Sequence, residues 1–523
     1  MRGSKWLDRC VRFLNGTARR YSEIIHDSKL PKSWTYFVLT CGIVYVWAVL
    51  SLCVFDSFVG LPLLYWACCA VFSWWLISNV VRVGFCNCAD DGLWMDGWRL
   101  FVCLVVILCM VAFTGSFTNP DTVWQWEQAT GSSPFDDWHP IVHTGVIAIL
   151  QRILRRYRLI VTFQAGVFAG LLTWLYLTLK KYRYGSKASL VVVLLLAFSP
   201  FSLQLISVLW KDTAFAFAAL AISVLLIQLV EERGANLSLA RAVSLALLIF
   251  LASFFRHNGI FYTVPLLVLL PFAVKRQYLV RTLSLVIVSF LMIGFYVCMA
   301  RPALVRNGII VVSKQGQSFV ESVGLPMSIM AESYVLHPER TPKEVIAFLE
   351  QIGDRTVWEK NYRGEFNSVK FNVSGGAGRV LNEIGPKDFG VLFVKTVKAN
   401  PVSSIKEFLY LTSCAWSPFP PRLQEVISFG SGVCASSVSA AGKLTLHSLI
   451  GYILCAPGFH LIVLVLALVC AILRRGWRVL VMAVPLICYQ FGTMLLLTGF
   501  DYRFFFITIL CSYPLSLALL KGE

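Results

Sequence analysis

Three observations predict an all-α polytopic membrane protein. First, 57% of the 523 residues are hydrophobic and only 14% are charged, with a mean hydropathy of +0.71, whereas soluble proteins carry about 25% charged residues. Second, the apolar residues form runs of about 17–25, the length that a helix needs to cross a bilayer. Third, the basic residues lie mainly between those runs. A soluble enzyme, a disordered chain and a small disulfide scaffold are thereby excluded.

The net charge of +18 fits a membrane protein. Cations that flank spans fix their orientation and meet anionic headgroups, so membrane lipids are expected partners and nucleic acid is not. Residues 1–33 are basic and are expected in the cytoplasm. The apolar runs that follow predict about twelve spans, at 35–55, 60–81, 98–118, 159–179, 188–208, 213–230, 242–255, 260–274, 282–300, 447–473, 479–498 and 504–520.

With the N-terminus inside, twelve spans also place the C-terminus in the cytoplasm of a multi-pass cell-membrane protein. The loops expected on that side are basic, as the orientation rule requires. The exception is residues 152–158, whose arginines fall on the outer side. We expect residues 139–154, about 16 residues that end in arginine, to form a helix in the plane of the outer membrane surface.

The chain beyond the N-terminus divides into four parts: 34–97 with two extra spans, 98–300 as a membrane core with an outer loop at 119–158, 301–446 as an α-rich outer-face domain, and 447–523 with three spans. The stretch 301–446 is too long for a linker and should fold against the membrane surface. Within it, residues 342–353 predict a helix capped by Thr341. Whether Cys414 and Cys434 pair is left open by the sequence.

The outer loop combines acids, histidines and tryptophans. A carboxylate there can take a proton from an attacking hydroxyl, and aromatic rings can stack on sugars. The alternative is a polar loop with ordinary interfacial tryptophans. His139 and His143 have the i, i+4 spacing of metal ligands but lack the glutamate of a His-Glu-x-x-His site, so no metal site is assigned and a divalent metal is left open. The other residues are Asp121, Trp124, Glu127, Asp136, Asp137 and Trp138.

Three short polar clusters interrupt the apolar runs. Ionisable residues at such places are functional candidates, and arginine offers donors that fit phosphate oxygens. The alternatives are structural ion pairs, a snorkelling lysine or a plain outer turn. The predicted topology puts all three clusters and the acidic loop on the outer side, which favours one shared site. The clusters are Lys211-Asp212, Arg256-His257-Asn258 and Asp501-Tyr502-Arg503.

Together these motifs resemble an uncharacterised bacterial branch of the GT-C superfamily of membrane glycosyltransferases. The matching stretches are Asn-Pro-Asp-x-x-x-Gln from Asn119, Asp-Trp-His-Pro-x-x-His-Thr from Asp137, Trp-Lys-Asp from Trp210, Arg-His-Asn-Gly from Arg256 and Asp-Tyr-Arg from Asp501. The resemblance covers most of residues 98–520 and does not explain 1–97. It implies a GT-C-like fold, a polyprenyl-phosphate-linked sugar as donor, and a glycan or lipid of the cell envelope as acceptor.

The resemblance also implies roles for single residues. A loop carboxylate acts as base, and Asp121 matches it by position, with Asp136 and Asp137 as alternatives. A single displacement would invert the anomeric carbon, and one carboxylate suffices because phosphate leaves without a general acid, unlike the pair in glycosidases. The candidates to hold the donor phosphate are Lys211, Asp212, Arg256, His257, Asn258, Arg503, Arg152 and Arg155. The candidates to line the substrate are Trp124, Glu127, Trp138, His139, His143, Asp501 and Tyr502.

Two other classes of function remain open from the residues. A transporter or flippase of lipid-linked saccharides would also use charged residues and broken helices, but the chain has no repeated halves. An assembly or sensor subunit would use residues 301–446 for interactions, and it leaves the acidic loop without a role. The active site of the favoured enzyme is expected on the extracytoplasmic side.

Overall fold

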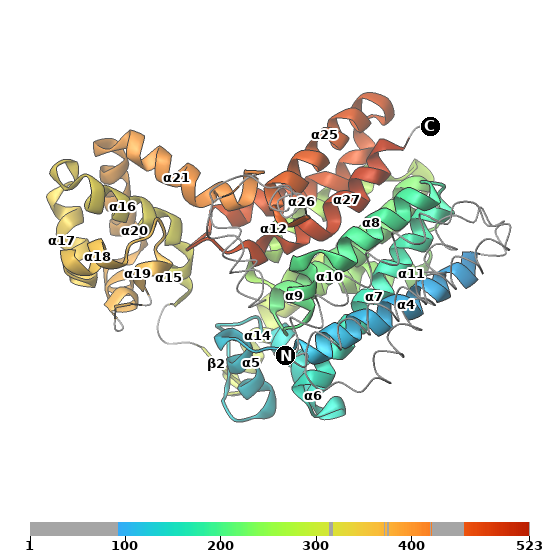
Figure 1. The fold of residues 1–523 in the computed structure, drawn as a ribbon, viewed down its shortest axis with the longest axis horizontal. Coiled ribbons are helices and arrows are strands. Elements are labelled where there is room, and N and C mark those ends of the chain that lie inside the picture. The colour runs from blue at the N-terminus through green and yellow to red at the C-terminus, as the bar shows by residue number, and fades with distance from the viewer. Residues whose placement is uncertain are drawn as a thin grey trace, which may run out of the picture. The chain divides into compact units, whose positions relative to one another are not determined.

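The computed structural model describes residues 93–312, 317–370, 372–373, 376–418, 420 and 454–521. The basic N-terminus, the expected spans 35–55 and 60–81, and Cys434 lie outside these residues. The described chain is almost entirely helical (Figure 1). Its strands are β1 (Phe135–Asp136) and β2 (Ile310–Val311), which pair in parallel.

Seven helical stretches in the described residues are long and apolar enough to cross a membrane, and one bent pair would make eight. A helical, multi-pass membrane protein is therefore supported, while the total of twelve spans stays a prediction. The bent pair, at 56°, is α8 (Ser186–Phe198) and α9 (Pro200–Ile206). The seven contain α4 (Leu93–Thr114), α7 (Tyr157–Lys181), α10 (Lys211–Glu231), α13 (Leu279–Phe295) with α14 (Arg301–Arg306), α25 (Pro457–Arg475), α26 (Leu480–Met494) and α27 (Phe506–Leu520).

Two of the expected spans are shorter helices. The run 242–255 forms α11 (Leu239–Phe255), and 260–274 begins with α12 (Ile260–Leu269). They meet at the 3-10 turn η2 (His257–Gly259). A Cβ on Gly259 would lie 2.1 Å from the carbonyl oxygen of Ala252, so the junction can close this tightly only around glycine.

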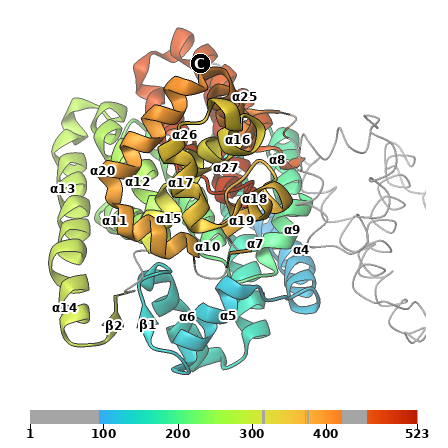
Figure 2. The ribbon, with the colours of Figure 1, turned by 90° about the vertical axis from the view of Figure 1, so that its left-hand side faces the viewer.

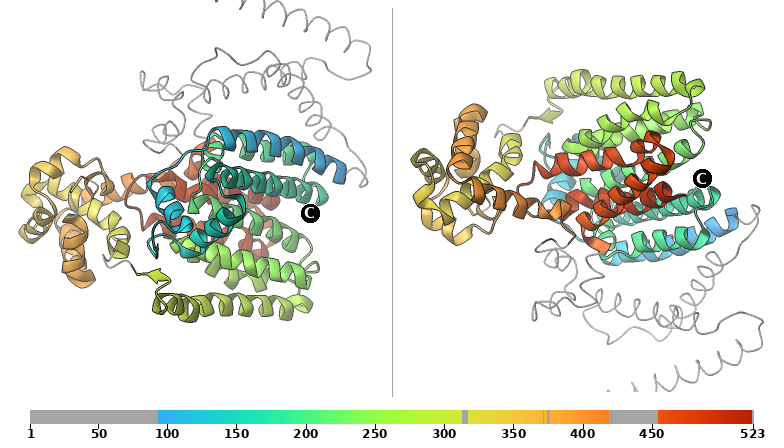
Figure 3. Two further views of the ribbon diagram at one scale, coloured as in Figure 1. Left: turned by 90° about the horizontal axis from the view of Figure 1, so that it is seen from below. Right: turned by 90° about the horizontal axis from the view of Figure 1, so that it is seen from above.

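The central helix of the bundle is α10, and 94% of its apolar window is buried. It packs against α7, α11, α26 and α27. Small buried residues such as Ala216 and Ala219 let neighbouring backbones approach it closely. By contrast, only 11% of the most apolar stretch of the long helix Arg276–Arg306 is buried, and this helix runs along the edge of the bundle (Figures 2 and 3).

The expected outer loop folds into two helices at one end of the bundle (Figure 2). The first, α5 (Pro120–Thr130), begins with a capping box in which Asn119 accepts the Thr122 backbone N–H and Thr122 accepts the Asn119 N–H. It ends at Gly131 in the left-handed conformation. The second, α6 (Ile141–Leu154), matches the helix expected over 139–154.

Residues 317–416 form a helical domain with an apolar core of its own, which includes Met327, Phe348 and Trp358. Its helices are α15 (Gln317–Ser322), α16 (Gly324–Leu336), α17 (Lys343–Ile352), α18 (Arg355–Asn361), α19 (Asn367–Lys370), α20 (Gly376–Ala399) and α21 (Pro401–Trp416).

The helix expected over 342–353 is α17, but Thr341 does not cap it. The cap position is Pro342, and the Thr341 hydroxyl lies 2.9 Å from the Ser333 carbonyl instead. The hydroxyl is held by the preceding helix, so the prediction of that cap was wrong by one residue. Cys414 is buried in α21.

Candidate functional site

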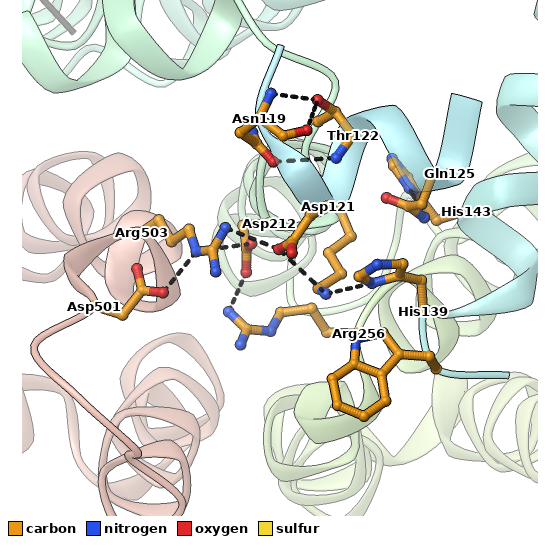
Figure 4. A network of polar contacts seen from close by, with 12 residues as sticks. Asn119, Asp121, Thr122, Gln125, His139, His143, Asp212, Arg256, Asp501 and Arg503 are labelled. Atoms are coloured by element: carbon orange, nitrogen blue, oxygen red, sulfur yellow. Dashed lines mark hydrogen bonds and ion pairs between the residues drawn. The ribbon is translucent and has the colours of Figure 1, made fainter. Parts of the chain in front are cut away.

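Charged side chains from four separated segments meet at the end of the bundle where α5 lies (Figure 4). Asp121 comes from the first turn of α5, and Lys211 and Asp212 come from the first turn of α10. Arg256 directly follows α11, and Arg503 lies in the 3-10 turn η8 (Tyr502–Phe505). We call these residues, together with Asp501, the charged cluster.

Asp121 lies between two cations. Its Oδ2 is 3.1 Å from Nη1 of Arg503 and 4.0 Å from Nζ of Lys211. Burial alone would raise the pKa of Asp121, but the charges of Arg503 and Lys211 outweigh burial and hold the pKa below its ordinary value. The side chain is 31% exposed, so this ionised carboxylate is also accessible to a partner from outside the cluster.

Asp212 and Arg256 form a buried ion pair, with side chains 1% and 7% exposed. A buried charge is costly unless it is paired, so each residue depends on the other. The Arg256 guanidinium also lies 4.1 Å from the centre of the Phe504 ring. The second oxygen of Asp212 is 3.9 Å from Nε of Arg503, so Asp212 links the two arginines.

Arg503 is the hub of the cluster. Its Nε donates to Oδ2 of Asp501 at 2.7 Å, its Nη1 donates to Asp121, and its guanidinium lies 4.9 Å from the centre of the Trp210 ring. A planar guanidinium can bind several carboxylates and stack at the same time, which an ammonium group cannot. The cluster holds three cations and three carboxylates, so its charges balance.

His139 extends the cluster from the segment before α6. Nζ of Lys211 lies 2.9 Å from Nδ1 of His139, and because an ammonium group only donates, Nδ1 is the acceptor and the proton sits on Nε2. Burial, reinforced by the charge of Lys211, lowers the pKa of His139 to about 3. The imidazole is therefore neutral, and its Nδ1 holds the Lys211 ammonium group in place as a hydrogen-bond acceptor.

Two tryptophans of the predicted substrate lining stack on each other beside His139. The rings of Trp124 and Trp138 are 6.2 Å apart at 16°, and Trp124 meets the His139 ring edge-on at 5.7 Å. Trp124 is 37% exposed. Since Asp121 lies one turn before Trp124 on α5, an exposed aromatic face and the accessible carboxylate share one helix.

Three other predicted residues hold neighbouring elements together rather than joining the charged cluster. Nε2 of His257 donates to the Trp138 carbonyl at 3.2 Å, and Nδ2 of Asn258 donates to Thr493 at 2.7 Å. His143 is 4% exposed and lies 3.1 Å from the Gln125 amide. Burial lowers the pKa of His143 to about 3, which fits a neutral packing residue.

The two alternative loop acids, Asp136 and Asp137, and the predicted lining residue Glu127 have other partners. Asp136 accepts the Trp138 backbone N–H at 3.1 Å, Asp137 pairs with Arg301 at 2.5 Å, and exposed Glu127 lies 3.5 Å from the Ser133 hydroxyl. These three partners all lie outside the charged cluster. The geometry therefore favours Asp121 as the acid of the site.

The remaining predicted residues divide in the same way. Arg152 and Arg155 are exposed, and within the described chain neither forms an ion pair with the cluster. Tyr502 is fully buried next to Arg503. Arg152 and Arg155 were phosphate-ligand candidates only through the resemblance. They lie at the end of α6, and the sequence did not show which way this helix end faces.

Sequence reasoning assigned no role to three residues that contact the predicted site residues. Trp210 and Phe504 stack on the arginines, and each directly precedes or follows a residue that was singled out, so an aromatic neighbour was the available signal. Arg301, the partner of Asp137, had no such signal, because the two lie 164 residues apart in the sequence.

In the part of the chain that the structure describes, no group of three or more His, Cys, Asp and Glu side chains is placed to hold a metal ion. The arrangement is instead a set of paired charges around the partly exposed carboxylate of Asp121, and an anion that displaced this carboxylate would meet Lys211 and Arg503. Comparisons with family models, with curated proteins and with solved structures give no match for this chain.

Proposed function

We propose that this protein is an integral membrane glycosyltransferase that moves a sugar from a polyprenyl-phosphate carrier to a glycan or lipid acceptor of the cell envelope. The observation that carries the proposal is the position of Asp121, an accessible carboxylate held within 4.0 Å of the cations Lys211 and Arg503. A base and two phosphate-binding groups are what one displacement at a phosphate-activated sugar requires.

The donor phosphate takes the place of Asp121 as the partner of the two cations. Arg503 offers a fork of N–H donors that matches phosphate oxygens, and Lys211 adds a point charge. When the phosphate neutralises these cations, Asp121 loses the charges that hold its pKa down, and it becomes a stronger base. Arg256 acts at one remove, because its partner Asp212 fixes the position of Arg503.

The transfer is one displacement. The acceptor oxygen forms a bond to the anomeric carbon, the bond from that carbon to the phosphate oxygen breaks, and its electron pair leaves with the phosphate. Asp121 takes the proton of the acceptor hydroxyl. The configuration at the anomeric carbon is inverted. The stacked rings of Trp124 and Trp138 offer a face for a sugar ring beside Asp121.

The test is transfer from a panel of polyprenyl-phosphate sugars to envelope lipids by the purified protein and its Asp121→Asn variant. We expect the variant to lose transfer by a factor of 100 or more, the usual contribution of an acid–base group, with an unchanged elution volume in detergent. The control is Glu339→Gln, an exposed acid of the helical domain, which should keep full activity.

Two results would contradict the proposal. Full activity of Asp121→Asn would move the base to Asp136 or Asp137. Transport of a lipid-linked saccharide across a vesicle membrane, with no new glycosidic bond, would make the protein a transporter, the second function that the sequence left open.

A further inference from the structure

The segment that carries Arg503 into the site has no regular structure. Residues 495–501 connect α26 to η8 without forming a helix, and Leu497, Thr498 and Gly499 within them are buried. Backbone N–H and C=O groups that are buried outside helices need partners from elsewhere. The source of those partners therefore decides what holds Arg503 in place.

The partners come from the helical domain. The Phe500 backbone N–H donates to Oε2 of Glu365 at 2.8 Å, and the Thr498 carbonyl accepts the Asn367 backbone N–H at 3.0 Å. The Phe500 ring meets Tyr410 of α21 edge-on at 5.0 Å. Three parts of the domain thus contact one short segment.

The fit leaves no room for a side chain. A Cβ on Gly499 would lie 2.7 Å from Oε2 of Glu365 and 2.8 Å from Nδ2 of Asn367. A Cβ on Gly324, at the start of α16, would lie 2.4 Å from Cα of Thr498. Gly324 lets the start of α16 approach the Thr498 backbone, whereas Gly499 makes room for the side chains of Glu365 and Asn367. Neither glycine has a positive φ that would by itself require glycine.

The held segment is directly coupled to the guanidinium. Asp501 follows Phe500, its N–H donates to the Gly499 carbonyl at 2.9 Å, and its carboxylate accepts from Nε of Arg503 at 2.7 Å. A shift of the Phe500 backbone therefore moves Asp501 and, through it, the group that faces Asp121. Displacements of about 1 Å are enough to impair a catalytic arrangement.

We propose that Glu365 is a positioning residue for Arg503, so that docking of the helical domain on residues 498–500 sets the geometry of the phosphate-binding group. The proposal rests on the proposed function in that Arg503 is taken to bind the donor phosphate. Glu365 acts as a hydrogen-bond acceptor for the Phe500 N–H, and it takes no proton from the substrate.

The first test compares Glu365→Gln with Glu365→Ala. The glutamine keeps an oxygen for the Phe500 N–H, whereas alanine removes it. We expect transfer by the alanine variant to fall roughly 10- to 100-fold, the effect of one lost hydrogen bond to a charged group, and the glutamine variant to stay within about 3-fold of the wild type. The matched control is Glu339→Ala, an exposed acid in the same domain. Equal losses in both Glu365 variants would overturn the hydrogen-bond role.

A double-mutant cycle separates positioning from general stability. If Glu365 acts through Arg503, then Glu365→Ala should have no further effect on residual transfer in an Arg503→Gln background. Additive losses would show that Glu365 only supports the fold and would overturn the proposal.

Amide hydrogen exchange tests the anchoring of residues 498–503 without measuring sugar transfer. We expect Glu365→Ala and Gly499→Ala to speed amide hydrogen exchange in the peptide that contains residues 498–503, while Gly390→Ala, where a Cβ meets nothing within 4 Å, leaves it unchanged. Unchanged exchange in both test variants would overturn the positioning. If the wild type transfers no sugar from any donor while the exchange responds as expected, the proposed function fails and the anchoring of the segment stands.

Discussion

The positive charge of Arg503 lowers the pKa of Asp121. Arg503→Gln removes the cation nearest Asp121, so the pKa of Asp121 should rise from its lowered value. Since the proposed transfer needs an ionised Asp121, the acid limb of kcat/KM should move to higher pH. A pH profile of transfer checks this, with Arg503→Lys as the control that keeps a positive charge. An acid limb at the same pH in the glutamine variant would remove Asp121 from the role of base.

The neutral His139 makes stability depend on pH. The unfolded imidazole takes up a proton near pH 6.5 and the folded one near 3, so the unfolded state binds more protons between these values, and acid favours unfolding. We expect the melting temperature to fall as the pH drops from about 7 to 4. His139→Asn keeps an acceptor for Lys211 and should reduce this slope, and His143, whose pKa in the fold is also about 3, contributes to the slope that remains. An unchanged slope would show that His139 takes up its proton at the same pH in the folded and unfolded states.

Single residues were predictable where the chemistry is local. Lys211 and Asp212 are neighbours in the sequence, as are Asp501 and Arg503 within one turn, so their types alone marked them. The ion pairs between distant segments were not predictable. Asp212 meets Arg256, and Asp137 meets Arg301, only because the helices pack as they do.

The capping box of α5 should matter more for function than its energy suggests. Asn119→Ala removes the side-chain acceptor of the Thr122 N–H and should cost about 1 kcal/mol of stability. Because Asp121 lies in the same turn, transfer should fall as well. Ser238→Ala removes a cap at the start of α11, whose other end leads to Arg256, and it should lower stability with activity retained. Thermal melts and transfer rates distinguish the two.

Elements were predicted best where the hydropathy pattern was long. The expected spans within the described chain all correspond to helices, because an apolar run has few other ways to satisfy its backbone in a membrane. Their ends were less predictable. The run expected to stop at 300 continues to Arg306, and Pro200 divides the run 188–208 into a bent pair, since proline lacks the N–H that a continuous helix needs.

At the scale of the molecule, the charged cluster lies at one end of the bundle, and a second set of ion pairs lies away from it. Away from the charged cluster, Glu231 of α10 accepts from Arg475 at 3.0 Å, Lys521 at 2.6 Å and Tyr184 at 2.7 Å. We expect Glu231→Gln to lower stability by roughly 1–3 kcal/mol while transfer per folded molecule stays unchanged. The control is the neighbouring Glu232→Gln. The Glu232 side chain is more exposed, so this variant should lose less stability. Thermal melts in detergent measure the difference, and lost transfer in a fully folded Glu231→Gln sample would link the two ends.

The long helix Arg276–Arg306 has 31 residues and so measures roughly 46 Å, about 15 Å more than the hydrocarbon layer of a bilayer. Its end carries Arg301, the partner of Asp137, and β2 follows to pair with β1. The end of this helix is therefore joined to the loop 119–158, which also carries Asp121. In a thicker bilayer this helix would extend less far beyond the lipid tails, and the loop joined to its end would lie nearer to them.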